Sequence, residues 1–112
     1  MLLNTVTMDG SLVVKVKGEL DLLTAETFRN LVERELNRGR AQNLILDMEH
    51  VSFIDSSGLG VILGRYRRIR EQGGTMAIVG VKPHVKRILE LAGIMGIIKI
   101  YEETDQALAD VN

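Results

Sequence analysis

Apolar residues recur along the chain in two alternating patterns, which predict strands and helices in turn. Dense apolar runs, as found in buried strands, occupy residues 2–6, 11–16, 43–48 continued by 51–55, 75–80, and 96–101. Apolar positions three and four residues apart, which form one face of an amphipathic helix, recur over residues 24–39, 57–72, 83–93 and 104–111. The predicted order of elements is therefore ββαβαβαβα.

The alternation of strands and helices sets the expected topology of the sheet. Helical crossovers join parallel strands, so most of the sheet is expected to be parallel. The first two strands are joined by Asp9-Gly10, which favours a tight hairpin turn, and they are expected to be antiparallel. We predict a small α/β fold, with a mixed, mostly parallel sheet and helices packed on it, as a single domain over residues 1–112.

Polar residues mark the expected starts of the helices. Thr24 is expected to cap the first helix and Thr104 the last. Ser56 or Ser57 is expected to cap the second by accepting hydrogen bonds from the free amides of the following turn, which is worth about 1 kcal/mol. Pro83 suits the first position of the third helix.

The composition narrows the classes of function. The 112 residues carry a net charge of -1, without the basic excess of a protein that binds nucleic acid directly. The chain has no cysteine, which excludes disulfides and thiolate chemistry. No apolar run reaches the ~18 residues of a membrane span, and residues 1–10 do not have the pattern of a signal peptide. We expect no membrane association and, by default, a cytoplasmic location.

The segment SFIDSSGLGVILGRY, residues 52–66, holds the most distinctive chemistry in the chain. An apolar strand ends in an acid, two serines and a glycine follow, and a helix begins. The spacing matches neither the nucleophile elbow, nor the dinucleotide-binding loop, nor the Walker loop. No pattern ties His50 or His84 to the serines as the base of a triad, and both are interpreted as isolated surface histidines. We predict no catalytic residue; an enzyme with Ser56 or Ser57 as nucleophile is the disfavoured alternative.

Capping does not explain the glycines of this segment. Gly58 and Gly60 each cost a helix about 1 kcal/mol relative to alanine. Glycine in the first turn of an otherwise good helix indicates that another group approaches the backbone closely. From the residues alone, two interpretations stay open: capping by serine without further function, and the approach of a partner or a phosphate.

A second motif, GELD, covers residues 18–21 where the second predicted strand ends. Loops at the carboxyl ends of parallel strands form the functional edge of an α/β sheet. Asp21 is therefore expected to lie on the same edge as Ser56. The alternative is a turn that uses Gly18 and leaves the acid in solvent.

Arginines cluster in the helix that follows the serines, in the stretch GRYRRIR at residues 64–70. Arg65 and Arg68 share one stripe of this helix, while Arg67 and Arg70 lie on another. A solvated outer face is the favoured interpretation, and an acidic protein partner is the next. Nucleic acid comes last, because no aromatic residues interleave with the arginines for stacking.

Four motifs together make the chain resemble the STAS domains of anti-sigma factor antagonists, most closely those of the sporulation sigma F system. They are GELD at 18–21, FIDSSGLGVILGRY at 53–66, the GG turn at 73–74 and the PHVKR stretch at 83–87. The resemblance covers essentially the whole chain, and Asp-Ser-Ser-Gly-Leu-Gly is a specific motif. The fold it implies, a sheet with helices against it, agrees with the predicted order.

The resemblance implies regulation by partner switching, with no cofactor and no metal. Unphosphorylated, such a protein binds an anti-sigma factor that is also a serine kinase, and so frees a sigma factor. The kinase phosphorylates the serine after the motif's aspartate, here Ser56; the phosphorylated form dissociates, and a serine phosphatase restores it. Alternatives within the family are control of a general-stress sigma factor, or a place in a signalling or transport complex. The residues implied in partner binding are Gly18, Glu19, Asp21, Asp55, Ser57, Gly58 and Gly60.

Overall fold

A five-stranded sheet with four helices makes up the part of the chain that the computed structural model describes, residues 1–111. The elements follow the predicted order ββαβαβαβα, with a short 3₁₀ helix, η1, before the last strand. None of these helices is long and apolar enough to cross a membrane. The bounds are β1 Leu2–Met8, β2 Ser11–Leu20, α1 Ala25–Asn37, β3 Asn43–Ile54, α2 Ser56–Glu71, β4 Met76–Val79, α3 Pro83–Leu91, η1 Ile94–Gly96, β5 Lys99–Tyr101 and α4 Thr104–Val111.

The strands lie in the order β1-β2-β3-β4-β5, so each strand is placed beside the one that precedes it. β1 runs antiparallel to β2, and the other three pairings are parallel. Asp9 and Gly10 form the turn between β1 and β2 with φ of 52° and 78°. These angles confirm the predicted hairpin, because a two-residue type I′ turn needs positive φ at both positions.

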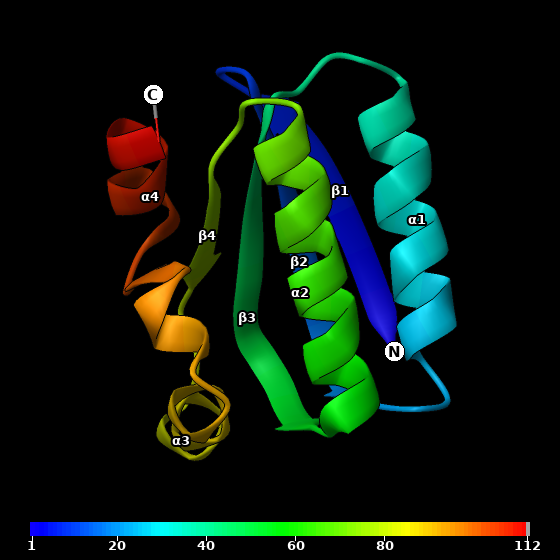
Figure 1. The fold of residues 1–112 in the computed structure, drawn as a ribbon, viewed down its shortest axis with the longest axis vertical. Helices are drawn as coiled ribbons and strands as arrows, with labels where there is room; N and C mark the ends of the chain where they lie inside the picture. The colour runs from blue at the N-terminus through cyan, green and yellow to red at the C-terminus, as the bar shows by residue number, and fades with distance from the viewer. Residues whose placement is uncertain (112) are drawn as a thin grey trace.

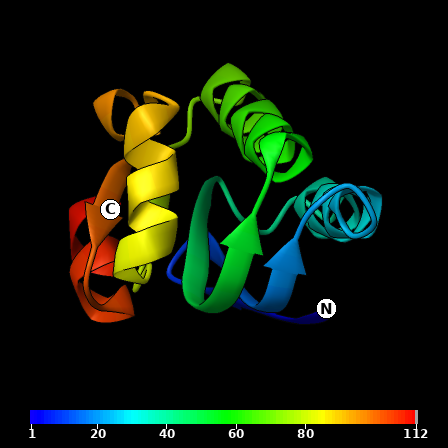
Figure 2. The same ribbon diagram turned by 90° about the horizontal axis from the view of Figure 1, so that it is seen from below.

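The helices cover the two faces of the sheet unequally (Figure 1, Figure 2). Apolar side chains of α1, α2 and α3 form the main core on one face, with the inward side chains of β2, β3 and β4. α4 packs on the other face, where Ala107 and Leu108 contact a smaller cluster with Val13, Ile45 and Val79. Because α4 contacts β3, β4 and β5 and does not extend to β1, the β1 end of this second face stays open.

The strands differ in length from their prediction. β1 and β2 extend to Met8 and Leu20, beyond the predicted runs at residues 2–6 and 11–16. β3 runs without a break through Glu49-His50, which the apolar pattern left between two strand segments. It stays paired with β2 because two register shifts between these strands absorb the irregularity. β5 is three residues long instead of six, since the chain before it folds into η1 and buries Ile94 and Ile98 in the main core.

The predicted caps of α1 and α4 are wrong. Thr24 occupies the N-cap position of α1, but its side chain makes no capping hydrogen bond. Its hydroxyl accepts a hydrogen bond from the Asp21 N–H (2.9 Å) and donates to the Glu19 carbonyl (2.8 Å). Thr104 lies inside α4 as its first residue. The hydroxyl of Thr24 therefore fastens the β2–α1 loop to the end of β2.

Candidate functional site

β2 and β3 end side by side, and the loops that follow them form one edge of the sheet, which faces the viewer in Figure 2. Leu20 pairs with Ile54 in the parallel register, so the next residues, Asp21 and Asp55, follow neighbouring strands. The Asp55 N–H donates to the Leu20 carbonyl (3.3 Å). The prediction that the GELD motif and the serine motif share this edge is therefore confirmed. Residues 19–23 and 53–57 are called the carboxyl-edge surface below.

The Asp55 carboxylate connects the two halves of this surface. Its Oδ1 accepts a hydrogen bond from the Gly58 N–H (3.0 Å), which caps α2. Its Oδ2 accepts one from the Leu22 N–H (3.1 Å) in the β2–α1 loop. One side chain thus fixes the loop against the start of the helix. The expectation that Ser56 or Ser57 caps α2 is wrong, because Asp55 lies one position earlier in extended backbone and reaches the free amide first.

The two serines are left free of the capping role, and they differ in exposure. Ser56 is the first residue of α2 and is exposed to solvent. Ser57 is half-buried. The hydroxyl of Ser56 thus stands at a helix N-terminus, where the unpaired amides and the helix dipole favour negative charge.

Carboxylates dominate the charge of the carboxyl-edge surface. Glu19 is exposed, and Asp21 and Asp55 are half-buried. Burial tends to raise the pKa of the Asp21 carboxyl. The Thr24 hydroxyl, whose proton is shared between Asp21 and the Glu19 carbonyl, and the N–H groups of Leu23 and Thr24 outweigh burial and lower this pKa. Asp21 is therefore ionised at neutral pH, and this edge is negatively charged.

The structure gives Gly58 and Gly60 different roles. Gly58 is buried, and a Cβ at this position would lie 2.2 Å from the Leu20 carbonyl oxygen and 2.8 Å from Cγ1 of Ile54. The group that approaches this glycine closely is therefore the end of the chain's own β2. Gly60 is exposed, and a Cβ there would meet no atom within 4 Å. Of these two glycines, Gly60 is the one that leaves open space at the helix surface.

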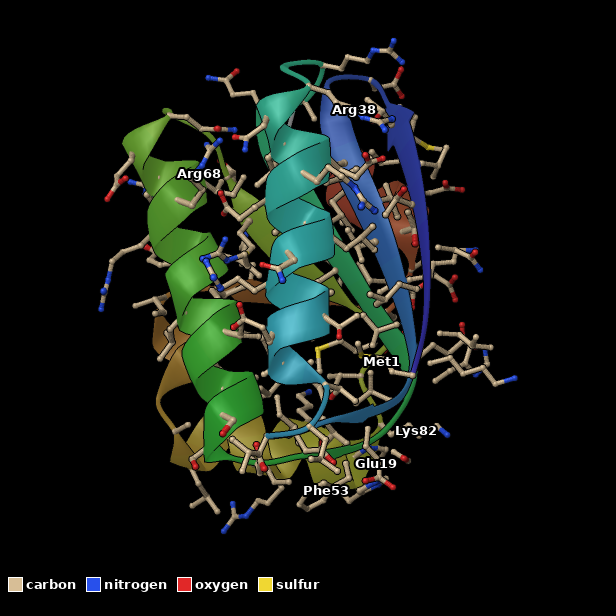
Figure 3. The ribbon with its side chains drawn as sticks, turned by 90° about the vertical axis from the view of Figure 1, so that its right-hand side faces the viewer. Met1, Glu19, Arg38, Phe53, Arg68 and Lys82 are labelled. Carbon is tan, nitrogen blue, oxygen red and sulfur yellow. The ribbon has the colours of Figure 1, made fainter. Side chains whose placement is uncertain are left out.

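Three apolar side chains of the carboxyl-edge surface were missed by the sequence predictions. Leu22 and Leu23 are 73% and 87% exposed, and Phe53 is 46% exposed. The Leu22 N–H is bonded to Asp55, so the two leucines lie beside the start of α2. Phe53 lies at the same end of the molecule as Glu19 (Figure 3). The sequence signal that could have identified this apolar patch is the pair Leu22-Leu23 in a loop, where polar residues are usual.

The histidines do not form a catalytic arrangement with the serines. Nε2 of His84 is hydrogen-bonded to the Ser52 carbonyl (2.8 Å), which holds the start of α3 against the end of β3. Both His50 and His84 are exposed, as interpreted from the sequence. Among residues 1–111 no group of three His, Cys, Asp or Glu side chains could hold a metal ion.

Two of the clustered arginines bind another helix of the same chain. Arg65 is buried and forms an ion pair with Glu33 of α1. Arg68 (Figure 3) lies 3.5 Å from the same carboxylate and donates to Asn37 (3.0 Å). Burial lowers the pKa of the Arg65 guanidinium, and the charges of Arg29 and Arg68 add to this. For the stripe with Arg65 and Arg68, both interpretations, a solvated outer face and a surface for an acidic protein partner, are wrong. The arginines of the other stripe are exposed: Arg67 and Arg70.

Sequence and structure comparisons confirm the resemblance. The STAS domain model matches residues 3–107. An anti-sigma F factor antagonist of Paenibacillus polymyxa is 39% identical over 102 residues, which cover 91% of this chain and 87% of that protein. A candidate anti-sigma factor antagonist from Thermotoga maritima has a TM-score of 0.91 at 31% identity, covering 97% of this chain and 93% of that one. Phosphorylated SpoIIAA of Bacillus shares the fold, with a TM-score of 0.77 at 23% identity over 99% of this chain and 100% of that one. The chain belongs to the STAS domain family and, within it, to the anti-sigma factor antagonists.

Proposed function

We propose that this protein is a phosphorylation-controlled switch which, when unphosphorylated, binds an anti-sigma factor with serine kinase activity and so releases a sigma factor. As an anti-sigma factor antagonist of the STAS family, it is a regulator and not an enzyme. The observation that carries the proposal is the position of Ser56, exposed at the start of α2 on the carboxyl-edge surface. The sigma F system is favoured because the Paenibacillus relative is an anti-sigma F factor antagonist.

The carboxyl-edge surface has the composition of a protein-binding site. Its exposed leucines and Phe53 supply apolar surface next to the carboxylates and serine hydroxyls of the same segments. Apolar anchors within a polar rim are the usual anatomy of a specific interface. The kinase would contact Gly18, Glu19, Asp21, Ser57 and Gly60 around Ser56. Asp55 would hold the β2–α1 loop in place, and Gly58 allows the close packing beneath.

Ser56 can be phosphorylated without loss of the fold. The α2 cap is made by Asp55, so modification of the serine hydroxyl removes no capping hydrogen bond. The phosphate would stand at the N-terminus of a 16-residue helix, where anions are favoured. The switch would therefore act on the partner interface and leave the domain folded.

Phosphorylation would end binding by charge and by loss of fit. A phosphoserine adds about -1.5 to -2 charges at pH 7 to an edge that already carries the carboxyl groups of Glu19, Asp21 and Asp55. Burying this dianion against a protein surface shaped for a hydroxyl is costly. A thousandfold loss of affinity requires only about 4 kcal/mol.

A serine phosphatase would complete the cycle by restoring the hydroxyl of Ser56. The cycle would run in the cytoplasm, where ATP, the kinase and the sigma factor meet. A general-stress sigma factor, or a signalling or transport complex, is the alternative setting for the same switch. Binding measurements against anti-sigma kinases of the different systems discriminate between these settings.

The test is phosphorylation by the cognate anti-sigma kinase with ATP, followed by mass spectrometry of the peptides. We expect one phosphate on Ser56, none in Ser56→Ala, and normal labelling in the matched variant Ser57→Ala. Ser56→Asp should bind the kinase at least about tenfold more weakly than the wild type while keeping its fold. Phosphate on Ser57, or full affinity of Ser56→Asp, would refute the proposal.

A further inference from the structure

The two edges of the sheet are protected to different degrees. β5, at one edge, has three residues, and its Lys99 pairs with Asp110 of α4 (3.1 Å). β1, at the other edge, has seven residues, LLNTVTM, with no charge and no proline, and its register with β2 is unbroken. Charges, prolines, bulges and short length are the devices that keep an edge strand from pairing with another strand. β1 has none of them.

The outer side of β1 presents a regular row of backbone groups. In an antiparallel pair, hydrogen-bonded and non-hydrogen-bonded residue pairs alternate along the strands. Met8 and Ser11 flank the two-residue turn and form a hydrogen-bonded pair, so the even residues of β1 bond to β2. The N–H and C=O groups of Leu3, Thr5 and Thr7 therefore point away from the sheet. β1 (dark blue) forms the margin of the fold in Figure 3.

The side chains of β1 leave this edge accessible. Leu2, Val6 and Met8 are 65%, 45% and 40% exposed. They lie on the same face of the sheet as α4, at the β1 end that α4 does not reach. On the other face a groove of about 430 Å³ opens between β1 and α1 along Leu3 and Asn30. Neither face therefore blocks the approach of a further strand.

We propose that β1 pairs with β1 of a second copy of this chain, in antiparallel orientation about a two-fold axis through Thr5. This register sets Leu3 opposite Thr7 of the second copy and Thr5 opposite Thr5. Every residue of these pairs directs its backbone groups outward, so six hydrogen bonds join the copies. The sheet becomes continuous across ten strands.

The partner strand at this edge comes from a second copy of the chain, because β1 is complementary to itself in this register. Leu2 comes opposite Met8 of the second copy, on the same face, so the exposed apolar side chains of both copies join in one cluster. Thr5 faces Thr5 through backbone groups, while its hydroxyl donates to Glu35 of α1 (3.2 Å). No charged residue of β1 meets its like, since the strand has none. The pairing does not involve Ser56 and stands apart from the switch proposed above.

The test is sedimentation velocity of the full chain between about 1 µM and 1 mM. We expect a monomer–dimer equilibrium, which Val6→Lys weakens about tenfold or more by placing like charges in the joined cluster. The control is Ile97→Lys, since Ile97 is exposed to a similar extent (49%) away from β1. Thr7→Pro should also weaken the dimer, because it removes an outward N–H and leaves the pairing with β2 intact.

Amide hydrogen exchange locates the interface in the same samples. Protection of Leu3, Thr5 and Thr7 should rise with protein concentration, while Asn4 and Val6 are protected at every concentration by β2. A wild type that stays monomeric throughout the range would overturn the proposal. So would a dimer that Val6→Lys weakens no more than Ile97→Lys does, or one that protects amides outside β1.

Discussion

Alanine substitution of two glycines in the first turns of α2 should change stability in opposite directions. Gly58 and Gly60 are two residues apart in one helix, and neither has positive φ. Gly58→Ala places a methyl group against the end of β2. Gly60→Ala places the same group in open space.

The magnitudes follow from the geometry around each position. Alanine in a helix interior is about 0.5–1 kcal/mol more stable than glycine, and Gly60→Ala should gain this amount. At Gly58 the new Cβ would lie 2.2 Å from the Leu20 carbonyl oxygen, so the backbone must shift by about 1 Å to restore an ordinary 3.4 Å contact. Overpacking of this kind costs about 1–3 kcal/mol. The shift also strains the hydrogen bond from the Asp55 N–H to the same carbonyl. We expect Gly58→Ala to lose about 2 kcal/mol in total.

Urea unfolding of the two variants and the wild type, followed by circular dichroism, gives the free energies of unfolding. In thermal unfolding the midpoints should lie about 10 °C apart, with Gly60→Ala above the wild type and Gly58→Ala below it. Equal stability of the two variants would refute the assignment of Gly58 to internal packing. The close approach would then have to come from a partner, as the sequence alone allowed.

Three further predictions concern the polar contacts that hold the site and the two long helices. Asp55→Ala should lose about 2 kcal/mol of unfolding free energy, since it removes the α2 cap and the bond to the Leu22 N–H, while Ser57→Ala should change it by less than about 0.5 kcal/mol. Glu33→Ala should cost about 3 kcal/mol because it leaves the buried Arg65 guanidinium without its counter-charge, and adding Arg65→Met should recover most of the loss. Asp21 has a lowered pKa in the folded state. The stability that its carboxylate contributes is therefore present above the ordinary pKa of about 4 and is lost as the pH falls through the folded-state value. Asp21→Asn lacks this carboxylate and should lose less stability than the wild type on acidification.

Each of these predictions has an outcome that contradicts it. If Ser57→Ala loses more unfolding free energy than Asp55→Ala, a serine and not Asp55 makes the main cap of α2. If Arg65→Met fails to rescue Glu33→Ala, the pair contributes packing and not charge compensation. Parallel acid unfolding curves of Asp21→Asn and wild type would show that the hydrogen bonds to this carboxylate do not favour its ionised form.

The order of elements and the shared edge could be predicted from the sequence because both depend on local signals and general rules. Apolar periodicity marks strands and helices, and Asp9-Gly10 marks the one antiparallel pairing. The rule that crossover connections give parallel strands then places the ends of β2 and β3 together. This rule is enough to place Asp21 and Asp55 on one surface from the sequence alone.

The capping residue and the role of Gly58 could not be predicted, because both depend on where β3 ends relative to β2. Asp55, Ser56 and Ser57 are all good capping residues, and three adjacent candidates cannot be ranked by type. The pairing of Leu20 with Ile54 decides between them, since it fixes the backbone of Asp55 in an extended conformation. The same pairing brings the Leu20 carbonyl against Gly58. Local sequence patterns cannot predict the register between two strands whose paired residues are more than thirty positions apart.

The division of roles in the DSSG segment, residues 55–58, explains how the serine of the proposed switch can be placed at the start of a helix. A serine whose hydroxyl also capped α2 would change its capping hydrogen bond, worth about 1 kcal/mol, each time it was phosphorylated. Here the carboxylate of Asp55 makes the cap and holds the neighbouring loop, while Gly58 lets the helix start pack directly on β2. In the proposed switch, Asp55 and Gly58 hold the structure of the helix start and stay unmodified. Ser56 would then carry a phosphate whose charge acts on the partner alone, so the two proposed states could share one fold.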